Sequence, residues 1–312
     1  MFNVNRKGTS LRTATARSVV HMAPATLAAI DAGEVPKGDP LEVAKVAAVQ
    51  AVKNTPQIIP YCHPIRIDGV EVAYTREAGA VIAEVTVTGV DRTGVEVEAM
   101  TGAAVAALTL YDMLKMIDGD LRIGEVRLLE KRGGKSDFRR FDTAKLRAAV
   151  LVLSDSIAAG RKRDLSGLMI RDRLEAEGLQ VADYAIVSDD PGEIEAQLLR
   201  YADEDRLDLV VTTGGTGFGP RDNVPEVMSR VLEREAPGIP EAARAHGQAR
   251  TPFSMLSRAR AGVRGRTLIV NLPGSRGGVS DSLDALFPGL PHAFKMLWGG
   301  GHGDDARPEV TG

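Results

Sequence analysis

The sequence contains almost no cysteine: Cys62 is the only one among its 312 residues. A single thiol cannot form a disulfide within the chain, hold an iron–sulfur cluster or build a cysteine-rich zinc site. Taken alone, Cys62 is best interpreted as a small apolar side chain that fills space. This composition fits the reducing environment of the cytoplasm.

Aromatic residues are few, and the chain carries no excess of basic charge. Aromatic residues make up 4% of the chain, and the formal net charge is -3. Proteins that bind nucleic acid usually combine a basic face with rings on which bases stack. We therefore expect small anionic molecules as partners, and we do not expect nucleic acid.

Long hydrophobic runs are absent as well. The N-terminal segment MFNVNRKGTS has no apolar signal-peptide core. No later stretch of the sequence approaches the roughly 18 uninterrupted apolar residues of a membrane span. We expect a cytoplasmic protein that does not enter a membrane.

The chain is long enough for two hydrophobic cores of ordinary size, with 44% hydrophobic and 26% charged residues. The segment KRGGKSDFRRFDTAKLR, residues 131–147, is basic and poor in aliphatic side chains, which is typical of a domain boundary. We predict a first domain at 1–143, a linker at 144–147, a second domain at 148–303 and a tail at 304–312.

The first half of the chain predicts an α+β domain. IRIDGVEVAYT and AVIAEVTVTGV alternate apolar and polar residues, as strands with one solvated face do. A helix opens at Asp39-Pro40 and is expected to stop at Asn54, and a second should occupy about 99–117. With LRIGEVRLLE as a further strand, the pattern predicts a ferredoxin-like fold, in which helices cover one face of an antiparallel sheet.

The second half alternates strands and helices, which predicts a three-layer α/β domain with a mostly parallel sheet. Ligands of such sheets bind at the carboxyl ends of the strands. Polar clusters follow four of the expected strands, at Ser154-Asp155, at Asp189-Asp190, in the loop that precedes Asp222, and at 273–275. We expect these loops to converge on one site.

The loop TTGGTGFGPRD, residues 212–222, is rich in glycine. Glycine lets main-chain amides approach a ligand closely, and amides at the next helix start favour an anion. No Gly-Lys-Ser/Thr follows and no GxGxxG is present, so this is neither a P-loop nor a dinucleotide fingerprint. Asp222 offers a hard oxygen ligand, and we predict a site for phosphate and Mg²⁺. The plain alternative is a tight turn without a ligand.

In the first half, Glu98 and Asp112 lie 14 residues apart on the second expected helix, which separates them by about 21 Å. They either act separately or a neighbouring subunit completes the pocket, and we favour an oligomer. Asp112 and Lys115 form a surface ion pair or, if enclosed, an acid–base pair. His63 alone is interpreted as a hydrogen-bonded turn residue, and its segment offers too few ligands for a metal.

Residues 1 to about 143 resemble cyclic pyranopterin monophosphate synthase, an enzyme of molybdenum cofactor biosynthesis. The resemblance is carried by KGDPLEVAKVAAVQAVK (37–53), IPYCHP (59–64), TGVEVEAMTGAAVAALTLYDMLK (93–115) and GEVRLLEKRGGKSDF (124–138). It implies a lyase that converts 3',8-cyclo-7,8-dihydroguanosine 5'-triphosphate to cyclic pyranopterin monophosphate and pyrophosphate, in a pocket between subunits of a homo-oligomer, a hexamer or trimer-based assembly. It makes Asp112 and Lys115 the catalytic pair. The substrate-binding positions that it implies are Arg12, Lys37, His63, Glu96, Glu98 and Lys131.

Residues 148 to about 300 resemble the adenylyltransferases that activate molybdopterin, through LSDSIAAGRKRDLSG (153–167), VSDD (187–190), TTGGTGFGPRD (212–222) and NLPGS (271–275). The resemblance implies a nucleotidyltransferase that takes molybdopterin and ATP and uses Mg²⁺ as cofactor. It makes Asp189 and Asp222 both catalytic residues and metal ligands. The positions that it implies for phosphate or pterin are Gly214, Gly215, Thr216, Gly217, Ser257 and Ser275.

Two residues depart from the pattern of the second family. Val224 replaces the usual threonine, and Arg276 stands where proline is common. The first change removes a hydroxyl group and the second adds a cation near the expected phosphates. Two alternatives stay open: the second domain is a pterin-binding or scaffold module, or acts on another nucleotide, and the first domain is a structural unit that only oligomerises the chain.

Overall fold

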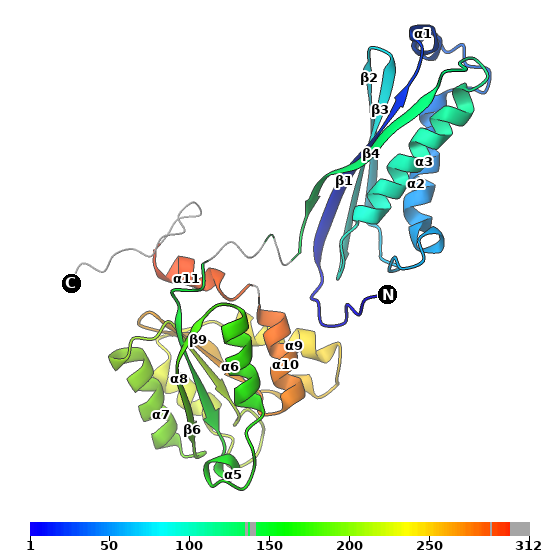
Figure 1. Cartoon of the computed structure of the whole chain (residues 1–312). Helices are drawn as coiled ribbons and strands as arrows, with labels where there is room; N and C mark the ends of the chain where they lie inside the picture. The colour runs from blue at the N-terminus through cyan, green and yellow to red at the C-terminus, as the bar shows by residue number, and fades with distance from the viewer. Residues whose placement is uncertain (135–136, 138–141, 288, 300–312) are drawn as a thin grey trace. The chain divides into compact units, whose positions relative to one another are not determined.

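The computed structural model describes residues 1–134, 137, 142–287 and 289–299 (Figure 1). Contacts divide the chain into two compact units, Met1–Phe138 and Arg139–Gly312. Each unit has its own sheet and its own cores. The predicted tail at 304–312 lies outside the described residues. Arg147, which the sequence analysis places in the linker, is the first residue of a strand.

The first unit is built on a four-stranded antiparallel sheet with the order β2-β3-β1-β4. Two long helices cover one face of this sheet, as Figure 1 shows. The predicted α+β class with helices on one face is confirmed. Its elements are β1 (Ser10–His21), α1 (Pro24–Ala32), α2 (Pro40–Ile58), β2 (Gly69–Glu77), β3 (Ala80–Asp91), α3 (Glu96–Leu114) and β4 (Arg122–Arg132).

Small residues let α2 and α3 pack closely on this sheet. Ala48, Ala99 and Ala103 are fully buried between the helices and the strands. Gly102 of α3 leaves no room for a methyl group, because a Cβ there would lie 2.7 Å from Cγ2 of Val52 in α2. This close packing fixes the direction of α3 along the sheet. The helix carries three of the predicted site residues, Glu96, Glu98 and Asp112, and Lys115 follows directly after it.

The end of α2 differs from the prediction. The helix continues beyond Asn54 to Ile58 and contains Pro56. Proline has no main-chain N–H and therefore removes one helical hydrogen bond. In the last turns of a helix this loss is tolerated. The hydroxyl of Thr55 donates to the carbonyl of Ala51 over 3.0 Å. At the end of the helix, the main-chain amide of Ile59 donates to the carbonyl of Thr55.

The second unit is built on a six-stranded sheet with the order β6-β5-β7-β10-β9-β8. Neighbours among β6, β5, β7 and β10 run parallel, and β9 and β8 are added antiparallel. The strands are β5 (Arg147–Leu153), β6 (Gln180–Val187), β7 (Leu209–Thr213), β8 (Arg234–Glu235), β9 (Ala261–Arg264) and β10 (Thr267–Leu272). The predicted mostly parallel α/β architecture is confirmed.

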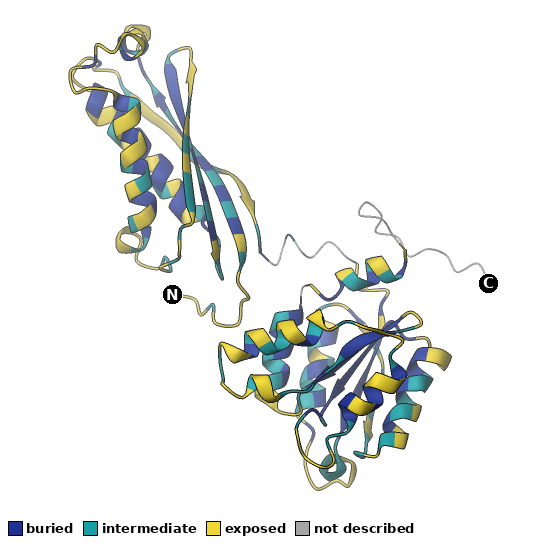
Figure 2. Cartoon of the chain, turned by 180° about the vertical axis from the view of Figure 1, so that it is seen from behind, coloured by how far each residue is buried: buried dark blue, intermediate teal, exposed yellow. Residues whose placement is uncertain are grey.

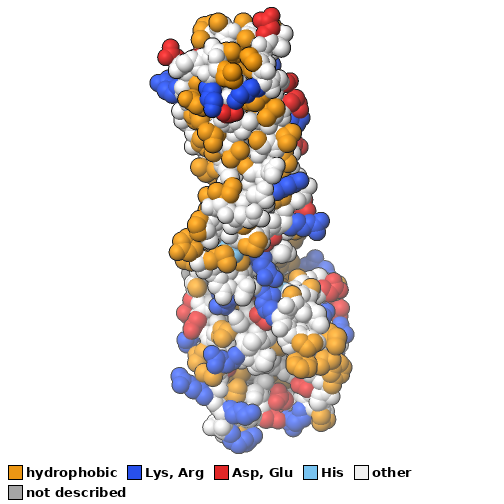
Figure 3. Space-filling model, turned by 90° about the vertical axis from the view of Figure 1, so that its right-hand side faces the viewer, with side chains coloured by type: hydrophobic (Ala, Val, Ile, Leu, Met, Phe, Trp, Pro, Cys, Tyr) orange, Lys and Arg blue, Asp and Glu red, His pale blue; other side chains and the backbone are white. Residues whose placement is uncertain are grey.

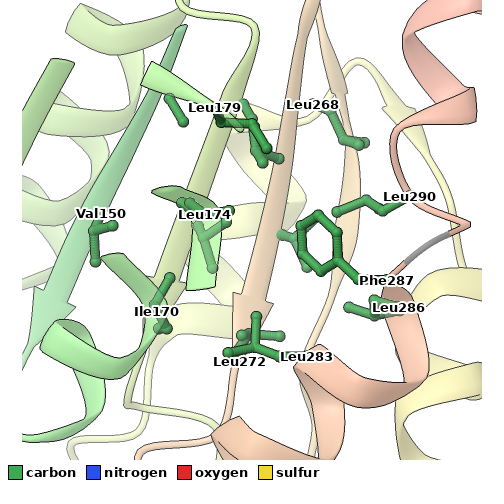
Figure 4. Packing of buried hydrophobic residues seen from close by; sticks show 14 of the residues in the cluster. Val150, Ile170, Leu174, Leu179, Leu268, Leu272, Leu283, Leu286, Phe287 and Leu290 are labelled. Atoms are coloured by element: carbon green, nitrogen blue, oxygen red, sulfur yellow. The ribbon is translucent and has the colours of Figure 1, made fainter. Parts of the chain in front are cut away.

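Helices lie on both faces of this sheet, so that the unit has three layers (Figures 1 and 2). One core packs Ile170, Leu174 and Phe287 against one face, as Figure 4 shows. The other packs Leu198 and Met228 against the opposite face. The helices are α5 (Asp155–Ala158), α6 (Ser166–Ala176), α7 (Pro191–Leu199), η1 (Arg200–Glu204), α8 (Val224–Val231), α9 (Gly238–Gln248), η2 (Ser254–Leu256), α10 (Arg276–Leu286) and α11 (His292–Leu297).

Among the described helices, α3 alone is long and apolar enough to cross a membrane, with a mean hydropathy of 1.2. Half of that helix window, 50%, is buried inside the first unit. Core helices of folded domains pass the same test, and α3 packs on β1 and α2, so its composition is explained by the core.

Candidate functional sites

Two loops at the carboxyl edge of the second sheet are cross-linked by carboxylates. The main-chain amide of Asp155, after β5, donates to Oδ2 of Asp189 over 3.0 Å. The amide of Asp189, after β6, donates to Oδ1 of Asp155 over 3.0 Å. Each carboxylate therefore fixes the backbone of the other loop.

Arg221 joins the glycine-rich loop to this pair. Its Nε and Nη2 lie 2.6 Å and 2.8 Å from the two carboxylate oxygens of Asp155. The adjacent Asp222 turns back into its own loop, where Oδ2 accepts the amide of Gly219 over 2.8 Å. The structure thus brings Asp189 and Asp222 to the same rim through Asp155 and Arg221. From the sequence, Asp155 is predicted to be part of a polar cluster after its strand, without a role of its own.

The glycines of this loop serve two different purposes. Gly214 and Gly215 have φ angles of +112° and +62°, and a Cβ on either would lie 2.3 Å from Leu153 O or from Val224 Cγ2. They set the path of the loop against the core. A Cβ on Gly217 would lie 2.8 Å from Oδ2 of Asp222, so this glycine makes room for the carboxylate.

Val224 is fully buried as the first residue of α8 and packs within the core beside α7. The hydroxyl that this chain lacks at that position would therefore lie in an apolar environment. The valine at position 224 therefore affects the packing of the core next to the glycine-rich loop. The other departure, Arg276, is an exposed residue in the first turn of α10.

A cavity of about 600 Å³ opens beside the loop, between α9, η2, the end of β10 and the start of α10. Four of the predicted ligand-binding residues line it: Thr216, Gly217, Ser257 and Ser275. Gly214, Gly215, Asp189 and Asp222 are outside the described lining. Asp222 lies beside the cavity, because a Cβ on the lining residue Gly217 would meet its carboxylate.

The cavity has features that suit an anion. Ser275 caps α10, and its hydroxyl oxygen accepts the amide of Gly278 over 3.1 Å. Gly277 and Gly278 of the same first turn line the cavity, and the start of an eleven-residue helix favours negative charge.

Arg258 is hydrogen-bonded to main-chain carbonyls of the glycine-rich loop. Its Nε donates to the carbonyl of Gly217 over 2.8 Å, and its Nη2 donates to the carbonyl of Asp222 over 2.5 Å. Its own amide donates to the carbonyl of Thr216 over 2.9 Å. Arg258 was not predicted from the sequence, because its partners lie about forty positions earlier and no local sequence pattern indicates them.

Asp189 and Asp222 have the oxygen chemistry that Mg²⁺ prefers. The described residues contain no cluster of three or more histidine, cysteine, aspartate or glutamate side chains arranged for a metal. Magnesium in nucleotide sites commonly takes one or two carboxylates and completes its shell with phosphate and water. In the described part of the chain, Oδ1 of Asp189 and Oδ1 of Asp222 make no hydrogen bond, so both oxygens are free to bind a cation.

In the first unit, Asp112 lies between two lysines at the end of α3. Nζ of Lys37 is 2.8 Å from Oδ2 of Asp112, and Nζ of Lys115 is 2.7 Å from Oδ1. Hydrogen bonds first from Lys115 and then from Lys37 lower the pKa of Asp112 to about 2. The same contact raises the pKa of Lys115. Both lysines keep hydrogen-bond donors for an anion.

A second group of predicted residues lies at the start of α3. Nζ of Lys131, on β4, is 3.2 Å from Oε1 of Glu96. The guanidinium of Arg12, on β1, is 9% exposed and donates to the carbonyl of Gly133 over 2.9 Å. It also donates to the carbonyl of Asp91 over 3.3 Å. These bonds to main-chain carbonyls orient Arg12 without neutralising it.

Cys62 belongs to this group, contrary to its interpretation as filler. Its Sγ lies 3.0 Å from Oε1 of Glu98, and Glu98 is 1% exposed. Burial, and then the hydrogen bond to Glu98, raise the pKa of Cys62 to about 12, so it stays a thiol. His63 follows with Nε2 2.8 Å from the carbonyl of Phe2, as expected of a hydrogen-bonded loop residue.

The two groups of the first unit lie at opposite ends of α3. This helix has 19 residues and is therefore about 28 Å long. Within one chain, the structure does not bring Lys37, Asp112 and Lys115 together with Glu96 and Glu98. One small ligand cannot contact both groups of the same chain.

Two family models match the chain, the MoaC family over residues 1–134 and a probable molybdopterin binding domain over residues 149–292. The chain is 39% identical to a molybdenum cofactor biosynthesis bifunctional protein of Chlorobaculum tepidum, and the match covers 97% of this chain and 96% of that protein. A cyclic pyranopterin monophosphate synthase of Pelobacter propionicus is 50% identical over 45% of this chain and 89% of its own length. Among solved structures, the molybdopterin biosynthesis enzyme MoaB of Thermus thermophilus has 45% identity and a TM-score of 0.47, and the match covers 49% of this chain and 97% of that one.

Proposed function

Because the chain belongs to the family of bifunctional molybdenum cofactor biosynthesis proteins, we propose that its two units catalyse two separate steps of that biosynthesis. The first unit converts 3',8-cyclo-7,8-dihydroguanosine 5'-triphosphate to cyclic pyranopterin monophosphate and pyrophosphate. The second unit transfers adenylate from Mg-ATP to molybdopterin. Both steps are expected in the cytoplasm.

The observation that supports the first activity is the pairing of Asp112 with Lys37 and Lys115. Closing a cyclic phosphate and expelling pyrophosphate require proton transfer and stabilisation of negative charge. Asp112 and Lys115 are the proton-transfer pair. The cations Lys37, Lys131 and Arg12 bind the triphosphate.

This pocket is completed by a second copy of the chain. The start of α3 in one copy and the end of α3 in another supply the two groups that one copy keeps apart. Large hydrophobic side chains on α2 and α3, among them Val46 and Leu108 with 65% and 59% exposure, are available for such a contact. Figure 3 shows hydrophobic side chains gathered on the upper, N-terminal unit, with basic and acidic side chains interspersed.

Lys115→Ala tests the first activity. We expect it to abolish formation of cyclic pyranopterin monophosphate while the chain keeps its oligomeric state in sedimentation. Lys45→Ala is the matched control, since Lys45 is an exposed helical lysine with a 3.8 Å ion pair to Glu42. An unchanged product yield in Lys115→Ala would leave the unit as a structural assembly domain.

The observation that supports the second activity is the cavity beside the glycine-rich loop that carries Asp222, with Asp189 tied to that loop through Asp155 and Arg221. Negative charge spreads over the α-phosphoryl group during transfer, so amides and cations aimed at that charge accelerate the reaction. The loop amides and the start of α10 hold phosphate, and Ser257, Thr216 and Ser275 line the space for the pterin. A Mg²⁺ ion bound by Asp189 and Asp222 would neutralise phosphate charge and orient the leaving pyrophosphate.

Asp222→Asn tests the second activity. We expect loss of pyrophosphate release from Mg-ATP and molybdopterin, with molybdopterin binding retained in a direct titration. Asp172→Asn is the matched control, because Asp172 pairs with Arg171 on the exposed face of α6. If the wild-type chain binds molybdopterin but releases no pyrophosphate, the second unit is a binding or scaffold module.

A further inference from the structure

The cavity of the second unit has a wall with excess positive charge. Among the described residues that line it, the charged ones are Arg244, Arg250 and Asp281. Arg250 pairs with Asp281, with Nε 3.3 Å from Oδ1. Arg244, on α9, is therefore a cation that no acidic residue of this lining balances. A cleft with excess charge of one sign attracts a ligand of the opposite sign, so the wall favours an anion.

The hydrogen bonds of Arg244 leave one edge of its guanidinium available. Nη1 donates to the carbonyl of Ser257 over 3.3 Å and to the carbonyl of Ala259 over 3.2 Å. These bonds orient the half-buried side chain without neutralising it. In the part of the chain that the structure describes, Nε and Nη2 donate to no protein acceptor. These two nitrogens form the fork with which arginine binds two oxygens of one phosphate.

The neighbouring arginines do not offer such an edge. Arg258 donates from Nε and Nη2 to carbonyls of the glycine-rich loop and from Nη1 to Glu226. Nη1 of Arg260 pairs with Glu235. Both arginines belong to the chain segment that Arg244 contacts, yet each is matched with a carboxylate. The available edge therefore distinguishes Arg244 from them.

A second polar group of the cavity wall also lacks a partner. Asn271, at the end of β10, is 2% exposed and lines the cavity. Its Nδ2 donates to the hydroxyl of Thr212 and to the carbonyl of Gly214, whereas its Oδ1 is buried without a hydrogen-bond partner among the described residues. A buried acceptor without a donor is costly, so a ligand is expected to supply an N–H group. Together with Arg244, this indicates a ligand that carries both an N–H group and an anion, as a phosphorylated pterin does.

We propose that Arg244 binds the phosphate group of molybdopterin, so that the second unit selects phosphorylated pterins over pterins without a phosphate. This inference rests on the proposed function of the second unit for the identity of the ligand. Two phosphorylated molecules meet in that reaction. The contact with the carbonyl of Ser257 ties Arg244 to the side of the cavity assigned to the pterin, and leaves the loop amides for the phosphates of ATP.

Direct titration of the full chain with two pterins tests this proposal without turnover. The ligands are molybdopterin and the same pterin after a phosphatase has removed its phosphate. We expect the wild-type chain to bind molybdopterin more tightly. Arg244→Met should weaken molybdopterin binding about 10- to 100-fold, the range for loss of a hydrogen bond to a charged group, and leave binding of the dephosphorylated pterin unchanged. Arg260→Met is the matched control, because Arg260 pairs with Glu235, and it should change neither affinity.

Arg244→Lys separates recognition from packing, and it decides the case if the methionine variant does not fold. Lysine keeps the charge but lacks the planar fork, so this variant should lose part of the preference for the phosphorylated pterin and keep the affinity for the other. Equal weakening of both ligands would mean that Arg244 only holds segment 257–259 in place, and would overturn the proposal. Equal affinity of the wild-type chain for both pterins would also overturn it, and is the result expected if a carboxylate of another copy neutralised Arg244.

The outcomes also distinguish this inference from the proposed reaction. A preference for the phosphorylated pterin that depends on Arg244, without pyrophosphate release from Mg-ATP, would refute adenylation and support the inference. Pyrophosphate release with an unchanged KM for molybdopterin in Arg244→Met would do the reverse. Binding of neither pterin by the wild-type chain would refute the proposed function itself, and the assignment of Arg244 with it.

Discussion

The ion pair between Arg221 and Asp155 is predicted to position the glycine-rich loop while contributing little to the stability of the second unit. Arg221 is largely solvated, with 63% of its side chain exposed, and Asp155 is partly buried, with 32% exposed. Exposed ion pairs are usually worth about 0.2–1 kcal/mol, even when two hydrogen bonds form. Arg221→Ala should therefore destabilise the second unit by less than about 1 kcal/mol, or roughly 2–4 °C in Tm for a domain of this size.

The same substitution should strongly reduce catalysis. Arg221 is the link that ties the glycine-rich loop to Asp155 and through it to Asp189. Without it, Asp222 loses its register relative to Asp189, and a displacement near 1 Å at a reacting centre can cost about 100-fold in rate. We expect kcat for pyrophosphate release to fall about 10- to 100-fold.

The assay compares pyrophosphate release with thermal unfolding of the same preparations. Arg171→Ala is the control, since Arg171 forms an equally exposed pair with Asp172 on α6 and should change neither measurement beyond the stability expected of a surface pair. Unchanged catalysis in Arg221→Ala, or a loss of activity fully explained by unfolding, would refute the positioning argument.

Three further outcomes follow from the structure. Gly214→Ala should destabilise the second unit by about 1–3 kcal/mol in urea unfolding, because φ is +112° and its Cβ would meet Leu153 O at 2.3 Å. Val224→Thr should cost about 1–3 kcal/mol in the same assay and give no faster pyrophosphate release, since the hydroxyl would enter a dry core. The pKa of Asp112 is lowered, so its ion pairs stabilise the first unit above the usual aspartate pKa and lose that effect as the pH falls toward 2. Carboxyl NMR should find this pKa raised in Lys115→Ala; an unchanged pKa would contradict the pairing.

Much of the fold follows from local patterns in the sequence. The alternation in AVIAEVTVTGV predicts a strand with one solvated face, and its inward residues Val85 and Val87 are fully buried, whereas residues 80–83 are buried on both faces. The strand and helix alternation after residue 148 predicts the parallel sheet. The predicted end of α2 at Asn54 was wrong. Pro56 removes only one hydrogen bond, and a helix tolerates that loss near its last turn.

The contacts within the candidate sites were harder to predict from the sequence than the fold. A glycine-rich run predicts close backbone approach, but it cannot say that Gly214 and Gly215 face the core while Gly217 faces the cavity. That difference depends on Leu153 and Val224, which the fold supplies from other elements.

Contacts between distant segments account for the remaining gaps. Cys62 and Glu98 are 36 positions apart, and a lone cysteine carries no pattern that points to a buried carboxyl group. Arg258 reaches back 41 positions to Gly217 in the same way. Such partners are fixed by the packing of whole elements and have no local signature.

The most direct test of the two-carboxylate rim is a titration of Mg²⁺ into the full chain with ATP and molybdopterin, followed by pyrophosphate release. We predict release that depends on both Mg²⁺ and molybdopterin, and that is lost in Asp189→Asn and in Asp222→Asn while molybdopterin still binds. Full activity in either variant, or release that needs no divalent cation, would contradict the account.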